Sequence, residues 1–146
     1  MSSSESPIVA LLISPNREIA DAFLRTAAPA RLFQVVSDLK SYPPEQVLDM
    51  RLRQSNPDVV LIDLATDIEQ ACESIRYLVN RTPPVQVIGL HSSQDGNSIV
   101  RSLRAGAAEF LWMPFEPAAQ QAAYERVVKL CVPSAVESTE LGTVIG

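Results

Sequence analysis

The sequence is poor in the residues that build metal centres and disulfide frameworks. It has one histidine and two cysteines in 146 residues, and neither Cys72 nor Cys131 belongs to a C-x-x-C pair. Clusters of these residues at fixed spacings are the usual signature of zinc sites and of disulfide-stapled domains, and neither class is indicated here. We interpret both cysteines as small core hydrophobes, and we expect no metal site and no cofactor.

Long apolar runs and an excess of basic charge are also missing. No apolar run approaches the ~20 residues needed to cross a bilayer, and the N-terminal MSSSES has neither a basic nor an apolar signal region. The formal net charge is −5, whereas nucleic-acid binding begins with a basic face. We therefore expect a cytosolic protein with no nucleic-acid partner and no direct membrane insertion.

The chain instead alternates short apolar runs with amphipathic stretches. Runs typical of buried parallel strands occupy residues 8–13, 33–36, 57–63, 85–90 and 109–112. Helical spacing of apolar residues follows each run, over residues 17–28, 44–54, 68–79, 99–103 and 119–130. The third helix is preceded by a capping box of Asp67 and Gln70. Five strands alternating with five helices predict an α/β fold: a flavodoxin-like, doubly wound parallel sheet of strand order 2-1-3-4-5.

The length fits one domain with short tails. We expect a disordered start over residues 1–6, a globular domain over residues 7–131, and a linker with the possible start of a following domain over residues 132–146. The segment LGTVIG at residues 141–146 looks like a strand with nothing to pair with. A frayed tail and the first strand of a following domain are both open explanations.

The strongest candidate for a reactive group is Asp63, the last residue of the run PDVVLID at residues 57–63. In open α/β sheets the carboxyl ends of the strands form the crevice in which ligands bind. An acid at that place is therefore a candidate reactive group. The simpler interpretation is that Asp63 only marks the point where a buried strand leaves the core.

The order of these elements resembles the receiver domain of bacterial response regulators, over about residues 8–130. The most specific matches are PDVVLID at residues 57–63, AGAAEFL at residues 105–111, and Pro114-Phe115 after the fifth strand. The resemblance implies a receiver-like domain in which Asp63 occupies the phosphoacceptor position.

The resemblance also implies that the other functional positions of the receiver site are degenerate. Phosphoryl transfer to a carboxylate gathers negative charge, so it needs Mg²⁺ and cationic or hydroxyl partners. Where the family has an acidic pair, a hydroxyl residue and a lysine, this sequence has Ser14 and Pro15, His91, and Met113. We therefore expect an intact fold without enzymatic chemistry.

Two residues near this site leave alternatives open. Asp67 could supply a second carboxylate for a metal, although its capping role explains it at least as well. His91 could accept a hydrogen bond or a phosphoryl group, although a solitary loop histidine is more often merely solvated.

A narrower resemblance is carried by Ser41-Tyr42-Pro43-Pro44, by His91, and by FLWMPF at residues 110–115. These features resemble the atypical receiver domain at the N-terminus of the CpaE/TadZ pilus-assembly ATPases. That family implies a nucleotide-binding domain after the receiver-like one, and residues 141–146 would fit its first strand. The chain has no G-x-x-x-x-G-K-[ST] motif, so we expect no ATP binding by that route.

The leading functional hypothesis is a non-catalytic module that forms a homodimer or docks a protein partner, and thereby localises or regulates an attached ATPase. In the receiver family the fourth helix, fifth strand and fifth helix form the usual docking face. Candidate interface anchors on it are Arg101, Arg104, Trp112 and Tyr124. The simpler interpretations are core packing for Trp112 and a solvated helix face for the two arginines.

Two other functions remain open. One is a working phosphorelay receiver in which Asp63 accepts phosphate with the help of Mg²⁺. The other is a flavodoxin-type ligand binder, against which no glycine-rich phosphate loop follows the first strand.

Overall fold

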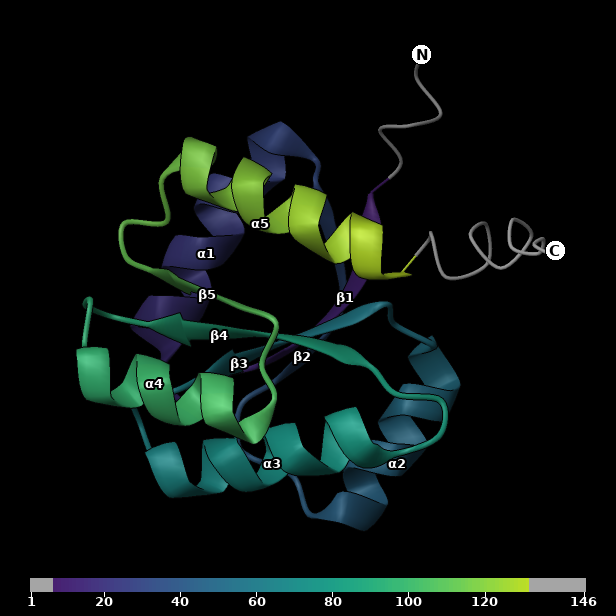
Figure 1. Ribbon diagram of the computed structural model, residues 1–146. Coiled ribbons are helices and arrows are strands. Elements are labelled where there is room, and N and C mark those ends of the chain that lie inside the picture. Colours follow the sequence, from purple (N-terminus) through teal and green to yellow (C-terminus); the bar gives the residue numbers. More distant parts are fainter. Residues whose placement is uncertain (1–6, 132–146) are drawn as a thin grey trace, which may run out of the picture.

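The computed structural model describes residues 7–131, which form a parallel sheet and its covering helices (Figure 1). The strands are β1 Ile8–Ile13, β2 Phe33–Leu39, β3 Val59–Asp63, β4 Gln86–His91 and β5 Glu109–Trp112. The helices are α1 Arg17–Ala30, α2 Glu45–Ser55, α3 Ile68–Asn80, α4 Gly96–Ala105 and α5 Pro117–Cys131. The sheet order β2-β1-β3-β4-β5, with every pair parallel, confirms the predicted topology. The expectations for residues 1–6 and 132–146 lie outside the described residues.

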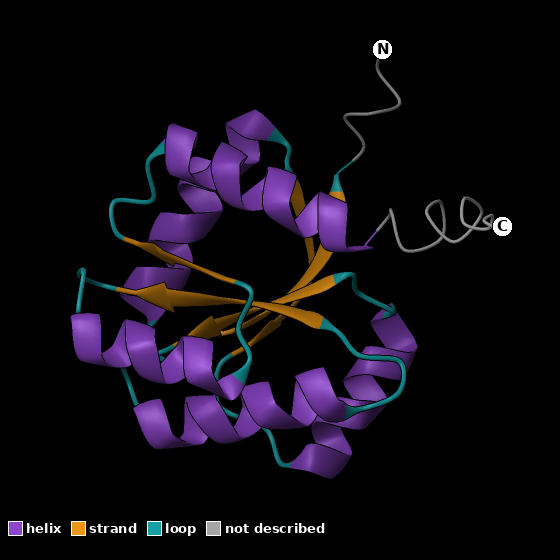
Figure 2. Ribbon diagram, viewed as in Figure 1, coloured by secondary structure: helices purple, strands orange, loops and turns teal. Residues whose placement is uncertain are grey.

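The helices cover both faces of the sheet (Figure 2). Helices α1 and α5 pack on one face around Phe23 and Phe115, while α2, α3 and α4 lie on the other around Leu48 and Ile75. The central strand β3 is buried along its whole length. Asp63 therefore lies at the carboxyl end of the most enclosed strand, with 0% of its surface exposed.

Side chains and backbone geometry fix the ends of the helices. Asn16 caps α1, and Asp67 caps α3 by accepting a 3.2 Å hydrogen bond from the backbone N–H of Gln70, as the capping box predicted. Gly106 ends α4 with φ +123°, where an added Cβ would lie 2.7 Å from a methyl group of Val79. The predicted glycine cap is therefore confirmed, and it requires glycine for both reasons.

Several element ends differ from the prediction by one to three residues, and strand β2 and helix α1 both run further than predicted. Strand β2 continues from the predicted residue 36 to Leu39, because β1 goes on pairing with it beyond a register shift. Its last residues include the polar Ser37 and Asp38, which hid the strand from an apolar pattern. Helix α1 continues from residue 28 to Ala30, and it ends where Arg31 takes a left-handed conformation.

Helix α4 packs on the domain through small residues rather than through its larger apolar ones. Ser98, Ser102 and Ala105 are buried, whereas Val100 and Leu103 are 45% and 43% exposed. The apolar residues that predicted this helix therefore lie mostly on its outer side.

Candidate functional site

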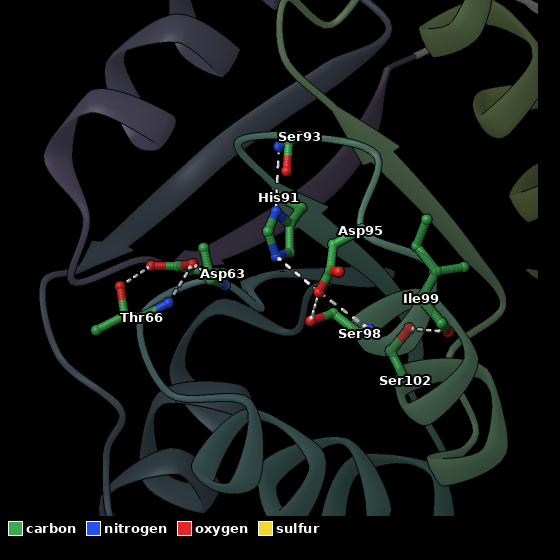
Figure 3. Close-up of polar contacts among 9 residues, drawn as sticks. Asp63, Thr66, His91, Ser93, Asp95, Ser98, Ile99 and Ser102 are labelled. Carbon is green, nitrogen blue, oxygen red and sulfur yellow. Dashed lines mark hydrogen bonds and ion pairs between the residues drawn. The ribbon is translucent and has the colours of Figure 1, made fainter.

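Asp63 is fully buried, and hydrogen-bond donors from two loops surround its carboxylate. Oδ1 accepts from the backbone N–H of Ala65 (2.7 Å) and of Thr66 (3.2 Å). Oδ2 accepts from the Thr66 hydroxyl (2.5 Å; Figure 3) and from the backbone N–H of Asn16 (3.2 Å). The carboxylate is therefore satisfied by neutral groups of its own chain.

The positions that correspond to the receiver acidic pair contribute little to this site. The Ser14 hydroxyl lies 3.4 Å from Asp63 Oδ2 but only 2.7 Å from the carbonyl oxygen of Asn16. A hydroxyl group has one proton, so the shorter contact takes it. The nearby guanidinium of Arg17 donates to Asp38 (2.7 Å) and to the carbonyl oxygen of Ser14 (2.9 Å). It is engaged there rather than with Asp63.

Tyr42, which precedes α2, forms hydrogen bonds with the backbone on both sides of the loop that follows Asp63. Its hydroxyl donates a 2.6 Å hydrogen bond to the carbonyl oxygen of Asp63 and accepts one of 3.3 Å from the backbone N–H of Asp67. Burial, followed by the charge of Asp63, raises the pKa of Tyr42 above its usual value, so the phenol stays protonated. Sequence reasoning missed this role. The available signal was a tyrosine beside two prolines. These residues follow the carboxyl end of β2, which lies at the same end of the parallel sheet as Asp63.

His91 ends β4, and its side chain is only 13% exposed, so the interpretation as a solvated loop histidine is wrong. Nδ1 accepts the backbone N–H of Ser93 (3.1 Å), which places the proton of the neutral ring on Nε2. Nε2 lies 3.8 Å from Oδ2 of Asp95, and that oxygen also accepts from the hydroxyl of Ser98 (2.6 Å; Figure 3). The hydrogen bonds from Ser98, and then the nearby imidazole, lower the pKa of Asp95. His91 thus lies next to Asp95, the capping residue of α4.

Met113 follows β5 at the position of the receiver lysine. Its backbone N–H donates to the carbonyl oxygen of His91 (3.0 Å), and its half-buried side chain packs against the apolar cluster under α1 and α5. A thioether cannot offset the charge of a phosphoryl group.

The residues around Asp63 do not fit Mg²⁺. This ion prefers several oxygen ligands, with carboxylates prominent among them. Both oxygens of Asp63 already accept hydrogen bonds from the chain, and Asp67 uses Oδ1 to cap α3. Within residues 7–131, no group of three or more histidine, cysteine, aspartate or glutamate side chains could hold a metal ion.

The four residues proposed as interface anchors do not form one exposed set. Trp112 is half-buried on the edge strand β5 and stacks on Phe110, with ring centroids 5.4 Å apart. Arg101 forms an ion pair with Glu69 (3.4 Å), and Arg104 is exposed. The prediction for Tyr124 is wrong, because its side chain is 6% exposed and belongs to the core between α5 and the sheet.

A cavity of about 260 Å³ lies between β5 and α5. Phe110, Trp112 and Pro114 form its aromatic and apolar wall, and Ala119 and Ala122 of α5 form the other side. Sequence reasoning missed Phe110, although a second aromatic residue two positions before Trp112 on one strand lies on the same face.

Among the described residues, none of the helices has both the length and the apolar character that a membrane crossing requires.

No family model matches the sequence. The transcriptional regulatory protein DegU from Brevibacillus brevis is 27% identical over 108 residues, which cover 74% of this chain. The match spans only 44% of the length of DegU.

Solved structures resemble the chain over most of its length. A pilus assembly-related protein from Burkholderia pseudomallei is 20% identical with a TM-score of 0.71, over 88% of this chain and 94% of that one. The pilus assembly protein CpaE from Burkholderia thailandensis is 19% identical with a TM-score of 0.68, over 84% and 98%. The receiver domain of a DNA-binding response regulator from Colwellia psychrerythraea is 18% identical with a TM-score of 0.65, over 84% and 98%. These likenesses, together with the strand order, show that the chain has the fold of a response regulator receiver domain.

Proposed function

We propose that this chain is a receiver-fold docking module that acts in the cytosol without catalysis and without a phosphoryl switch. The observation that carries the proposal is the environment of Asp63, whose buried carboxylate is held by neutral donors. A phosphoryl group on Asp63 would break these hydrogen bonds. It would also bring several negative charges to a place where Met113 replaces the lysine.

The docking surface that we propose comprises Val100 and Leu103 of α4 with Phe110 and Trp112 of β5, and we call it the α4–β5 surface. The two aliphatic side chains are nearly half exposed, and the two rings stack on each other at the edge of the sheet. Exposed apolar groups of this kind mark protein interaction sites. A tryptophan with a rigid neighbour is a frequent source of binding energy.

We propose that this docking module acts in pilus assembly. Two of the solved structures with this fold are named as pilus assembly proteins, and one is CpaE. The chain would then dimerise, or dock a protein partner, and so localise or regulate an ATPase of that system.

The absence of a phosphoryl switch is tested by incubating the protein with acetyl phosphate and Mg²⁺ and measuring its intact mass. We expect no stoichiometric phosphoryl adduct. The positive control is a receiver domain that has the acidic pair and the lysine, and we expect the same treatment to modify it. An adduct that disappears in Asp63→Asn would overturn the proposal. It would favour the alternative, a phosphorelay receiver with Asp63 as phosphoacceptor.

Self-association is tested by light scattering over a concentration series. Trp112→Ala and Leu103→Ser are expected to weaken the dimer by about tenfold or more in Kd. Val36→Ser is the matched control, because Val36 (46% exposed) is, like Leu103, an exposed aliphatic residue but lies on the opposite edge strand β2. A protein that stays monomeric at every concentration, with no change in these variants, would exclude the dimer.

A further inference from the structure

A second cavity lies between α2 and α3, in a part of the molecule that the proposed function does not use. Its volume is about 320 Å³, and its walls include Tyr42, Leu48, Glu45, Glu73 and Ser74. Figure 1 shows α3 between α2 and α4, so this cavity is separate from the α4–β5 surface.

The apolar wall of this cavity is held in place. The Tyr42 ring cannot turn away freely, because its hydroxyl is bonded to the carbonyl oxygen of Asp63. Leu48 beside it is 1% exposed and belongs to the core under α2. The cavity therefore offers a fixed aromatic ring next to aliphatic surface.

Ser74 contributes a hydroxyl group to the polar wall of the cavity. Ser74 is only 9% exposed, yet its hydroxyl makes no hydrogen bond with any described residue. A serine inside a helix can usually donate to the carbonyl oxygen four residues earlier. The Ser74 hydroxyl is thus available to a group that enters the cavity.

The rim of the cavity carries two glutamates. Glu45 and Glu73 are exposed, and neither forms an ion pair with a residue of the described chain. Asp49 of the same helix α2 differs, since it binds both Arg53 (2.9 Å) and Arg81 (3.0 Å). The two glutamates leave a local excess of negative charge at the mouth of an aromatic cavity.

We propose that this α2–α3 cavity receives an arginine side chain of a protein partner. A guanidinium group is planar, stacks on an aromatic ring, and presents five donors to carboxylate and hydroxyl oxygens. Its methylene stem can pack on the apolar surface of Pro43 and Pro44, which also line the cavity. The net charge of −5 favours the approach of a basic partner. A lysine has no plane to stack and fits less well.

A ligand in this cavity would also affect the loop at residues 64–66, which follows Asp63. The Tyr42 hydroxyl contacts both the carbonyl oxygen of Asp63 and the backbone N–H of Asp67. An arginine stacked on the ring therefore changes the magnetic environment of that N–H, which gives a direct readout.

The test is a ¹⁵N NMR titration of the whole chain with three probes: N-acetyl-argininamide, its citrulline analogue and its lysine analogue. The citrulline analogue has a similar shape to the arginine probe but carries no charge. We expect saturable shifts of the backbone amides of Tyr42, Asp67 and Ser74 with the arginine probe, a weaker response to lysine, and none to citrulline. A short peptide with one central arginine is expected to bind at least as tightly as the amide.

Variants locate the site. Glu73→Gln and Ser74→Ala should each weaken the arginine probe by about threefold. Glu18→Gln is the matched control, because Glu18 is, like Glu45, an exposed glutamate in the first turn of a helix. Equal shifts with lysine or citrulline, a peptide that does not bind, or equal losses in Glu18→Gln would each overturn the proposal. None of these outcomes bears on the phosphorylation or dimer assays.

Discussion

The Tyr42 hydroxyl donates a 2.6 Å hydrogen bond to the backbone carbonyl oxygen of Asp63. This contact joins the connection before α2 to the last residue of the central strand. The same hydroxyl accepts a hydrogen bond from the backbone N–H of Asp67, the capping residue of α3. One side chain thus supports both ends of the loop at residues 64–66, which supplies most of the donors to the Asp63 carboxylate.

Removing this hydroxyl should destabilise the fold without disturbing the ring. We expect Tyr42→Phe to lower the free energy of unfolding by about 1 kcal/mol, because the carbonyl oxygen of Asp63 and the N–H of Asp67 lose their partner. Urea denaturation measures the change. Tyr77→Phe is the comparison: the Tyr77 hydroxyl has a longer contact (3.3 Å) to Asp49, which two arginines also bind. A loss as large in Tyr77→Phe would contradict this account.

Alkaline pH should weaken the protein through the same residue. Burial, and then the charge of Asp63, raises the pKa of Tyr42 above its usual value of 10.0, so the unfolded chain releases this proton first. The contribution of Tyr42 is therefore complete below about pH 10 and is lost as the pH rises further. We expect the thermal midpoint to fall above about pH 10, and to fall less in Tyr42→Phe. Identical pH dependence of both proteins would show that another group is responsible.

Asp95 should contribute to stability at neutral pH and lose that contribution in acid. Hydrogen bonds from Ser98, and then His91, lower the pKa of Asp95 from 3.8, so its stabilising effect is present above that value and disappears as the pH falls through the folded-state pKa. Asp95→Ala should lower the thermal midpoint at neutral pH because α4 loses its cap. Asp95→Asn keeps a capping oxygen, so it should retain most of the midpoint while losing this part of the acid dependence. Two variants with equal midpoints would contradict the capping role.

Asp63 should be a major structural residue whether or not it is ever modified. In Asp63→Ala the backbone N–H groups of Asn16, Ala65 and Thr66 lose their acceptor inside the protein. We expect the free energy of unfolding to fall by about 3 kcal/mol. Asp63→Asn keeps one acceptor oxygen and should lose less. Urea denaturation of both variants measures the difference, and an alanine variant as stable as the parent would show that these donors have other partners.

The two glycines at the ends of α4 should respond oppositely to alanine. Gly106 has φ +123° and lies against Val79, so Gly106→Ala introduces both backbone strain and a clash. Gly96 begins the helix, and an added Cβ there meets no atom within 4 Å. We expect Gly106→Ala to be destabilising and Gly96→Ala to stabilise by about 0.5 kcal/mol. Differential scanning calorimetry of the pair gives both signs, and a neutral Gly106→Ala would contradict the strain argument.

The fold could be predicted because its central strands are continuous apolar runs and its helices carry clear stripes or caps. Strand β2 was cut short because Ser37 and Asp38 are polar residues of an edge strand. The position of Asp63 at the carboxyl end of the central strand could be predicted, because the apolar run at residues 57–63 ends there. Its environment could not be predicted, since backbone N–H groups, such as that of Ala65, supply most of the donors and no side-chain pattern reveals them.

Surface residues were harder to predict than core residues. The sequence shows that Trp112 and Tyr124 are aromatic, but not which side of its helix Tyr124 occupies. On α5 it shares a stripe with Ala123 and Val127, which turns it towards the sheet. Tyr42 was noted only as part of a stiff connection, because a hydrogen bond to a distant carbonyl oxygen leaves no trace in local spacing.

Helix α4 turns its serines inward and its valine and leucine outward. The residues that attach this helix to the domain are therefore different from the residues that it shows to other molecules. Changes at positions 100 and 103 therefore alter the outer surface of the helix while the domain keeps its shape, so a new binding surface could evolve here without the loss of a stable fold.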